Sequence, residues 1–87
     1  MIKRNVEFCF YAPGAVEVSI AGEFNNWNLQ TLPMKKHKDG IWKKTTKLLP
    51  GRYEYKMLVD RSWIEDLPGE EKVPNPFGTQ NFVRWVE

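Results

Sequence analysis

A lysine and a tryptophan lie on either side of a turn signal in the middle of the chain. Lys56 belongs to an alternating run of residues, Asp60-Arg61-Ser62 favours a turn, and Trp63 follows it. A short hairpin would bring the two side chains together. A large flat ring can cover the apolar C–H face of a pyranose, and an ammonium group can donate to its hydroxyl groups. The pair is therefore what we expect in a sugar-binding surface.

The other three tryptophans have different surroundings. Trp27 follows two asparagines in the polar loop 23–28, and asparagine favours turns and left-handed backbone, so we expect an exposed ring. The alternatives are that Trp27 plugs one end of the fold and that Trp63 only anchors its hairpin. Trp42 shares a strand face with Leu48 and lies in no ligand motif, which predicts packing in the core or at a sheet edge. Trp85 lies in the last predicted strand, and the pattern does not assign its face.

Short alternating segments separated by Gly, Pro and Asn turns run along the chain, and no window has helical periodicity. This predicts an all-β fold, an immunoglobulin-like antiparallel β-sandwich. Residues 66–78 hold three prolines and two glycines and are predicted to be a loop. The core face of the segment 52–59 should carry Tyr53, Tyr55, Met57 and Val59. The predicted strands are 6–11, 16–21, 32–37, 41–48, 52–59, 63–65 and 81–86.

The composition fits one small domain spanning residues 1–87. A net charge of +2 is too weak to argue by itself for nucleic acid or for an anionic membrane as a partner. The one cysteine cannot form an internal disulfide. We expect a cytoplasmic protein, because the chain has no apolar run of membrane-spanning length and its start lacks the apolar run of a signal peptide.

The sequence contains no clear pattern of catalytic or metal-binding residues. His37 has no Cys or His partner for a metal and no neighbouring nucleophile, and Cys9 lies in the middle of a strand. Glycoside hydrolysis needs two carboxylates across the scissile bond in a cleft, and the pairs Glu65-Asp66 and Glu70-Glu71 do not suggest one. We therefore expect no cofactor, no metal site and no enzymatic activity.

A basic hairpin surrounds the turn Lys38-Asp39-Gly40. Lysines protect an exposed strand edge from pairing with other chains, and this is the interpretation that we favour. The minority alternative is that the hairpin and exposed aromatic rings bind oligonucleotides. The lysines concerned are Lys35, Lys36, Lys38, Lys43, Lys44 and Lys47.

Four motifs in order give the chain a family resemblance. They are Phe24-Asn25-Asn26-Trp27, Tyr53-Glu54-Tyr55-Lys56, Val59-Asp60-Arg61-Ser62-Trp63 and Asn75-Pro76-Phe77-Gly78-Thr79-Gln80-Asn81. With them the chain resembles carbohydrate-binding module family 48, most clearly from about Val16 to Val86. That family includes the glycogen-binding domain of the AMP-activated protein kinase β subunit and the N-terminal domains of isoamylases and branching enzymes.

The resemblance implies a non-catalytic β-sandwich that binds α-1,4-linked glucan such as glycogen, starch or maltooligosaccharides. It implies that two tryptophans stack on glucose rings, that a lysine bonds hydroxyl groups, and that the last loop adds one apolar and two polar contacts. Two departures concern loop shape: Arg61 replaces a frequent glycine, and Asp66-Leu67-Pro68 replaces a common Asp-Pro. The implied binding residues are Trp27, Lys56, Trp63, Phe77, Thr79 and Asn81.

The main alternative function is that of an interaction module. In that case the same fold would dock onto a kinase or a glucan-metabolising enzyme, with weak or absent sugar binding. The dependence of affinity on salt concentration distinguishes sugar binding from oligonucleotide binding. Phosphate contacts weaken steeply as salt rises, whereas stacking on a neutral sugar does not.

Overall fold

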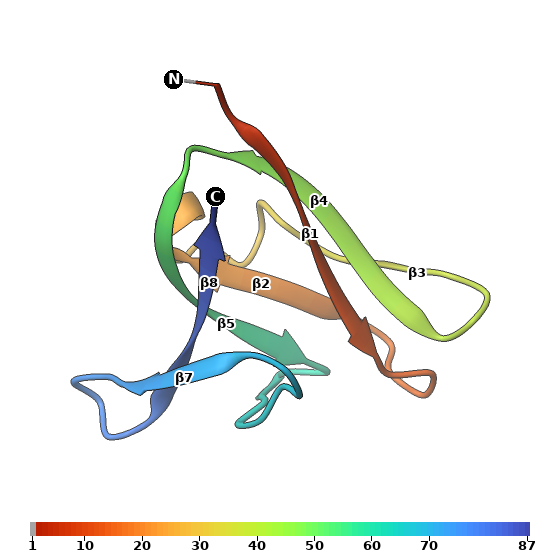
Figure 1. Cartoon of the computed structure of the whole chain (residues 1–87). Coiled ribbons are helices and arrows are strands. Elements are labelled where there is room, and N and C mark those ends of the chain that lie inside the picture. The colour runs from red at the N-terminus through yellow and green to blue at the C-terminus, as the bar shows by residue number, and fades with distance from the viewer. Residues whose placement is uncertain (1) are drawn as a thin grey trace.

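A computed structural model describes residues 2–87, which form two antiparallel sheets packed against each other (Figure 1). The first sheet has the strand order β1-β4-β3, and the second has the order β2-β5-β8-β7, with β6 paired to β5. The strands are β1 (Arg4–Tyr11), β2 (Val18–Gly22), β3 (Lys35–Lys36), β4 (Ile41–Leu48), β5 (Gly51–Val59), β6 (Ser62–Trp63), β7 (Glu71–Pro74) and β8 (Gln80–Val86).

The predicted all-β, immunoglobulin-like antiparallel sandwich is confirmed. Every strand pair between residues 4 and 86 is antiparallel. Within residues 2–87 the helical structure consists of one short 3-10 helix, η1 (Glu23–Asn25). Nothing helical in this part of the chain is long or apolar enough to cross a lipid bilayer.

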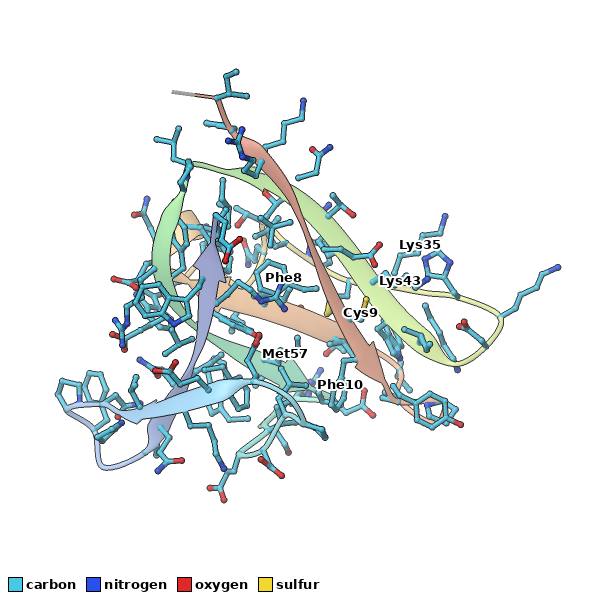
Figure 2. All side chains as sticks on the ribbon, viewed as in Figure 1. Phe8, Cys9, Phe10, Lys35, Lys43 and Met57 are labelled. Atoms are coloured by element: carbon cyan, nitrogen blue, oxygen red, sulfur yellow. The ribbon has the colours of Figure 1, made fainter. Side chains whose placement is uncertain are left out.

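The core lies between the two sheets and follows the alternation of the strands. Phe8 of β1 and Met57 of β5 come from opposite sheets and are fully buried between them (Figure 2). On β5 the predicted core face is confirmed, since Tyr55 and Met57 are buried and Tyr53 and Val59 pack against the core. Burial of these apolar side chains is the main stabilising contribution to such a fold.

Arg84 of β8 ties the two sheets together. Its Nη1 donates to the carbonyl oxygen of Glu7 on β1 at 3.0 Å, and its guanidinium lies 4.5 Å from the ring centroid of Phe8. Its Nε donates to Glu70 at 3.1 Å, and the same carboxylate accepts from the hydroxyl of Tyr55. Burial, followed by the bond to Glu70, raises the pKa of Tyr55, so this phenol stays protonated.

Two predicted strand boundaries are wrong for an identifiable reason. The second strand begins at Val18 rather than at Val16, because Asp60 accepts the backbone N–H groups of Val16 and Glu17 at 2.8 and 2.9 Å. These hydrogen bonds hold the pKa of Asp60 below its ordinary value. The predicted strand 32–37 is shorter, because its first part bridges to β2 through Pro33 and only Lys35–Lys36 pairs with β4.

The predicted loop 66–78 contains a strand, β7, which was missed. Glu71–Pro74 pairs with β8 at the edge of the second sheet. An edge strand tolerates a proline, since one side of its backbone makes no ladder bonds. The sixth strand is Ser62–Trp63 rather than 63–65. The first and last strands begin slightly earlier than predicted, at Arg4 and Gln80.

Candidate functional site

Trp27 is presented by a loop that Asn25 organises. The Asn25 side chain accepts from the Gly22 backbone N–H at 2.9 Å and donates to the carbonyl oxygens of Ile20 and Asn28 at 3.2 and 2.9 Å. Asn26 and Trp27 then take left-handed backbone, with φ of 53° and 59°. The predicted turn geometry is confirmed, and the Trp27 side chain is exposed (42%).

Gly22 must be a glycine for this loop to lie where it does. A Cβ at this position would lie 2.6 Å from the Cβ of Tyr55 and 2.8 Å from the carbonyl oxygen of Glu54. Such distances are well inside van der Waals contact. The Gly22 carbonyl also accepts the backbone N–H of Trp27 at 2.9 Å. The close approach of β2 to β5 therefore fixes where the Trp27 loop begins.

Trp63 is presented by the predicted tight hairpin. Val59 pairs with Ser62, so Asp60 and Arg61 form a two-residue turn, and both have positive φ, 48° and 68°. Positive φ at both positions is the mark of a type I′ turn, whose twist matches the flanking strands. Trp63 pairs with Leu58 on the face of β5 that carries Lys56, which is the face away from the core. The Trp63 side chain is 46% exposed.

The third segment, residues 75–79, is a compact turn built around Asn75. The Asn75 amide oxygen accepts the backbone N–H groups of Phe77 and Thr79 at 3.0 and 3.2 Å. Its amide nitrogen donates to Thr79 Oγ1 at 2.8 Å and to Asn81 Oδ1 at 2.9 Å. Gly78 supplies the left-handed position, with φ of 80°. The turn projects Phe77 into solvent, where 88% of its surface is exposed.

These three segments surround one groove on the outer face of the second sheet. The groove has a volume of about 780 Å³, within the range of small-molecule sites. All six residues that the resemblance implied line it, although they come from separate parts of the chain. A second groove of about 500 Å³ adjoins it and shares Lys56, Trp63 and Thr79. The main groove is lined by Ala21, Trp27, Leu29, Lys56, Trp63, Asn75, Pro76, Phe77, Thr79 and Asn81.

Lys56 and Thr79 form the polar part of the groove. Lys56 Nζ donates to Thr79 Oγ1 at 2.8 Å and lies 5.3 Å from the ring centroid of Trp63. Thr79 Oγ1 accepts from both Lys56 and Asn75, which occupies its two lone pairs, so its own hydrogen is left to donate. Lys56 keeps two further ammonium hydrogens. The groove therefore offers several donors beside its aromatic surfaces.

Asn81, one of the two polar contacts that the resemblance implied, is the least exposed of the six implied residues. It is buried, with 7% of its surface exposed, because it lies between Asn75 and Glu54. Its Nδ2 donates to Glu54 Oε1 at 3.0 Å, and Glu54 Oε2 in turn accepts from Arg52 at 2.8 Å. The bonds from Asn81 and then from Arg52 hold the pKa of Glu54 below its ordinary value. Asn75 and Glu54 thus hold the Asn81 side chain at the floor of the groove.

Sequence reasoning missed Asn75, Leu29, Pro76 and Ala21 as lining residues. Asn75 had a usable signal, since an Asn-Pro pair before a glycine favours a turn held by the asparagine side chain. Ala21 could have been found from its alternation with the buried Ile20, which puts it on the outer face of β2. Leu29 and Pro76 carry no signal beyond their positions beside Trp27 and Phe77.

Trp42, His37 and Cys9 do not line either groove. Trp42 is buried, as predicted, and its Nε1 donates to the Ala12 carbonyl oxygen at 2.9 Å. His37 is exposed. Cys9 is also exposed, and partial desolvation of its sulfur, followed by the hydrogen bond to Glu7, raises the pKa of the thiol. Over residues 2–87 no group of His, Cys, Asp and Glu side chains is placed to hold a metal ion.

Comparison with known proteins decides the family. Residues 1–77 match the family described as Carbohydrate-binding module 48 (Isoamylase N-terminal domain). The chain belongs to carbohydrate-binding module family 48. The match confirms the resemblance that the four motifs suggested and covers Trp27, Lys56, Trp63 and Phe77; Thr79 and Asn81 lie beyond it.

Several curated proteins are similar to this family 48 module. The 5'-AMP-activated protein kinase subunit beta-2 of Mus musculus is 37% identical over 71 residues, which cover 82% of this chain and 25% of that protein. The 1,4-alpha-glucan branching enzyme GlgB of Bacillus subtilis is 38% identical over 68 residues, which cover 71% of this chain and 10% of the enzyme. "Protein PTST homolog 2, chloroplastic" of Arabidopsis thaliana is 42% identical over 52 residues, or 60% of this chain and 10% of that protein. The module therefore spans a quarter or less of each relative.

Proposed function

We propose that this family 48 module binds α-1,4-linked glucan, such as glycogen, starch or maltooligosaccharides, in the groove between Trp27, Trp63 and Phe77. The single observation that carries the proposal is the convergence of these three exposed rings around Lys56 and Thr79. Glucose rings would stack on the aromatic surfaces, and the ammonium and hydroxyl donors would bond sugar oxygens. The names of the relatives, which include a glucan branching enzyme, support the substrate class.

The affinity of such a site should be modest. Each hydrogen bond to a sugar hydroxyl replaces one to water, so its net gain is about 1 kcal/mol. The rings supply the larger part, since they remove apolar sugar surface from water. Asn75, Asn25 and the tight Asp60-Arg61 turn hold the ring-bearing loops in place before ligand arrives. This lowers the entropy lost on binding.

We infer further that the module acts by binding and not by catalysis. No carboxylate lines the main groove among the residues described, and Glu65 stands without a second carboxylate in the adjoining one. Glu70, which the sequence offered as a candidate, is held by Tyr55 and Arg84. A pair of carboxylates facing each other across a glycosidic bond is what hydrolysis would need.

We also propose, in less specific terms, that the module docks onto a protein partner, either a glucan-metabolising enzyme or a kinase. Similar chains are named as a kinase subunit and as a glucan branching enzyme, and in both the matching segment is a small share of the whole. Docking onto a glucan-metabolising enzyme or a kinase is therefore compatible with sugar binding in the groove. The cytoplasmic location stays a prediction, because one relative is named chloroplastic.

The test is a calorimetric titration with maltoheptaose, at low and at high salt, beside a titration with a single-stranded oligonucleotide. We expect saturable glucan binding that hardly changes with salt, and we expect Trp63→Ala to weaken it. An oligonucleotide that binds more tightly than maltoheptaose and dissociates as salt rises would overturn the proposal.

A further inference from the structure

A second tryptophan with a cation beside it lies on the same sheet face, away from the groove. Trp85 of β8 is 60% exposed, and the guanidinium of Arg52 on β5 lies 5.9 Å from its ring centroid. The arrangement repeats that of Trp63 and Lys56, whose ammonium lies 5.3 Å from the indole. In both places β5 supplies the cation.

The strand register puts both indoles on one line along β5. Trp85 pairs with Arg52 and Trp63 pairs with Leu58, so both lie on the outer face, directly beside the strand. The two pairing positions on β5, Arg52 and Leu58, are six residues apart in sequence, which corresponds to about 20 Å at the usual rise of a strand. A linear chain of several sugar units can span that distance.

The Trp85 ring is held in place and flanked by polar groups. Its Nε1 donates to Glu71 Oε1 of β7 at 3.2 Å, so the polar edge of the indole is satisfied and the ring orientation is restricted. The Arg52 guanidinium forms an ion pair with Glu54 at 2.8 Å. A fixed apolar surface bordered by donors and acceptors is what stacking on a pyranose requires.

The surface between the two indoles is continuous with the floor of the groove. Glu54 accepts from Arg52 with one oxygen and from Asn81 with the other, so a chain of polar side chains joins the Trp85 position to the groove. Val83 lies on this outer face between Asn81 and Trp85 and is 2% exposed, although it is not part of the core cluster. Neighbouring side chains of the outer face therefore cover Val83.

We propose that Trp85, with Arg52 and Glu71, is a second sugar-stacking position, which takes a distant part of the same α-glucan chain that occupies the groove. This inference rests on the proposed function. A chain held at the groove brings its own next segment to Trp85 at high effective concentration, so a weak contact there strengthens binding of long chains. A short oligosaccharide bound in the groove does not reach Trp85.

The test compares maltotriose with short-chain amylose as ligands of the wild-type chain, Trp85→Ala, Trp85→Phe and Trp63→Ala. We expect Trp85→Ala to leave maltotriose affinity unchanged and to weaken amylose binding about fivefold or more, the lower end for one aromatic stacking contact. Trp85→Phe keeps a flat ring and should retain most of the amylose affinity. In the wild-type chain, the indole N–H signal of Trp85 should shift with amylose and not with maltotriose.

The outcomes separate this inference from the proposed function. If Trp63→Ala weakens both ligands but Trp85→Ala binds amylose as wild type does, the second position is wrong and the groove stands. If Trp85→Ala weakens maltotriose equally, Trp85 acts on the groove through the fold, which also contradicts a separate position. If the wild-type chain binds neither ligand, both proposals fail.

Discussion

Lys56 and Thr79 come from opposite ends of a segment that contains a hairpin and an edge strand, yet Lys56 Nζ donates to Thr79 Oγ1 at 2.8 Å. This bond joins the middle of β5 to the turn that presents Phe77. Its position between Trp63 and Asn75 makes it the polar centre of the groove. A ligand bound there would meet one ammonium and one hydroxyl donor at once.

Replacing the ammonium should weaken glucan binding without making it sensitive to salt. Lys56→Gln removes a charged donor that faces neutral hydroxyl groups, so we expect a loss of about 1 kcal/mol in binding free energy, equal at low and high salt. Lys47→Gln is the matched control, because Lys47 is exposed on the other sheet and the variant changes the net charge identically. A loss that disappears at high salt, or that Lys47→Gln reproduces, would show a long-range charge effect instead.

Trp42 should matter for stability alone. Trp42→Ala empties a buried site and leaves the Ala12 carbonyl without its partner, so we expect a loss of about 3–5 kcal/mol in the free energy of unfolding. Urea unfolding measures it. Trp85→Ala is the control, since that ring is 60% exposed and its loss should change stability little. Equal losses in the two variants would contradict the assignment of Trp42 to the core.

Arg61 occupies a position that suits glycine better. Its φ is 68°, and left-handed backbone costs a residue with a Cβ about 1–2 kcal/mol. Glycine escapes that cost but loses about 0.5–1 kcal/mol more conformational entropy on folding. We therefore expect Arg61→Gly to stabilise the domain by about 0.5–1 kcal/mol in thermal or urea unfolding. Arg61→Ala removes the same charge but keeps the Cβ, so it should not stabilise.

Acid should destabilise the domain partly through Glu54. The Glu54 pKa is lowered in the folded state, so at pH values between its folded and its ordinary value the unfolded chain binds more protons. The stability that Glu54 contributes is complete above its ordinary pKa of 4.5 and is lost as the pH falls through the folded pKa. Urea unfolding from neutral pH into the acid range should show a shallower decline for Glu54→Gln. Parallel curves for wild type and variant would exclude this contribution.

Much of the architecture could be predicted from local patterns, because alternation and turn residues act over a few positions. The Tyr55–Met57 core face, the Asp60-Arg61 turn and the Asn-rich loop could be predicted in this way. The convergence of Trp27, Trp63 and Phe77 came from the family resemblance rather than from spacing. The structure places the three rings around one groove, and sugar contact by these residues remains a prediction.

What escaped prediction depends on partners distant in sequence. β7 has little alternation of its own and exists because β8 offers it an edge. The second strand starts late because Asp60, far along the chain, takes the N–H groups of Val16 and Glu17. Asn81 is buried because folding places Glu54 and Asn75 on either side of it. No local pattern carries such information.

Trp27 and Trp63 are the two rings that we expect to face the sugar. Loss of either ring should weaken binding by about 1–3 kcal/mol, if stacking on sugar resembles stacking on nucleic-acid bases. Folding should survive both substitutions, because 42% and 46% of these side chains are exposed and neither belongs to the buried core. Thermal melts of Trp27→Ala and Trp63→Ala, with Trp42→Ala as the destabilised comparison, check that condition.

The most direct measurement is a heteronuclear NMR titration with β-cyclodextrin, followed at the indole N–H signals and assigned by the alanine variants. We predict that the signals of Trp27 and Trp63 shift together and saturate, while that of the buried Trp42 stays in place. A role for Trp27 and Trp63 in sugar binding is contradicted if no signal shifts, or if β-cyclodextrin binds but shifts the signal of neither residue.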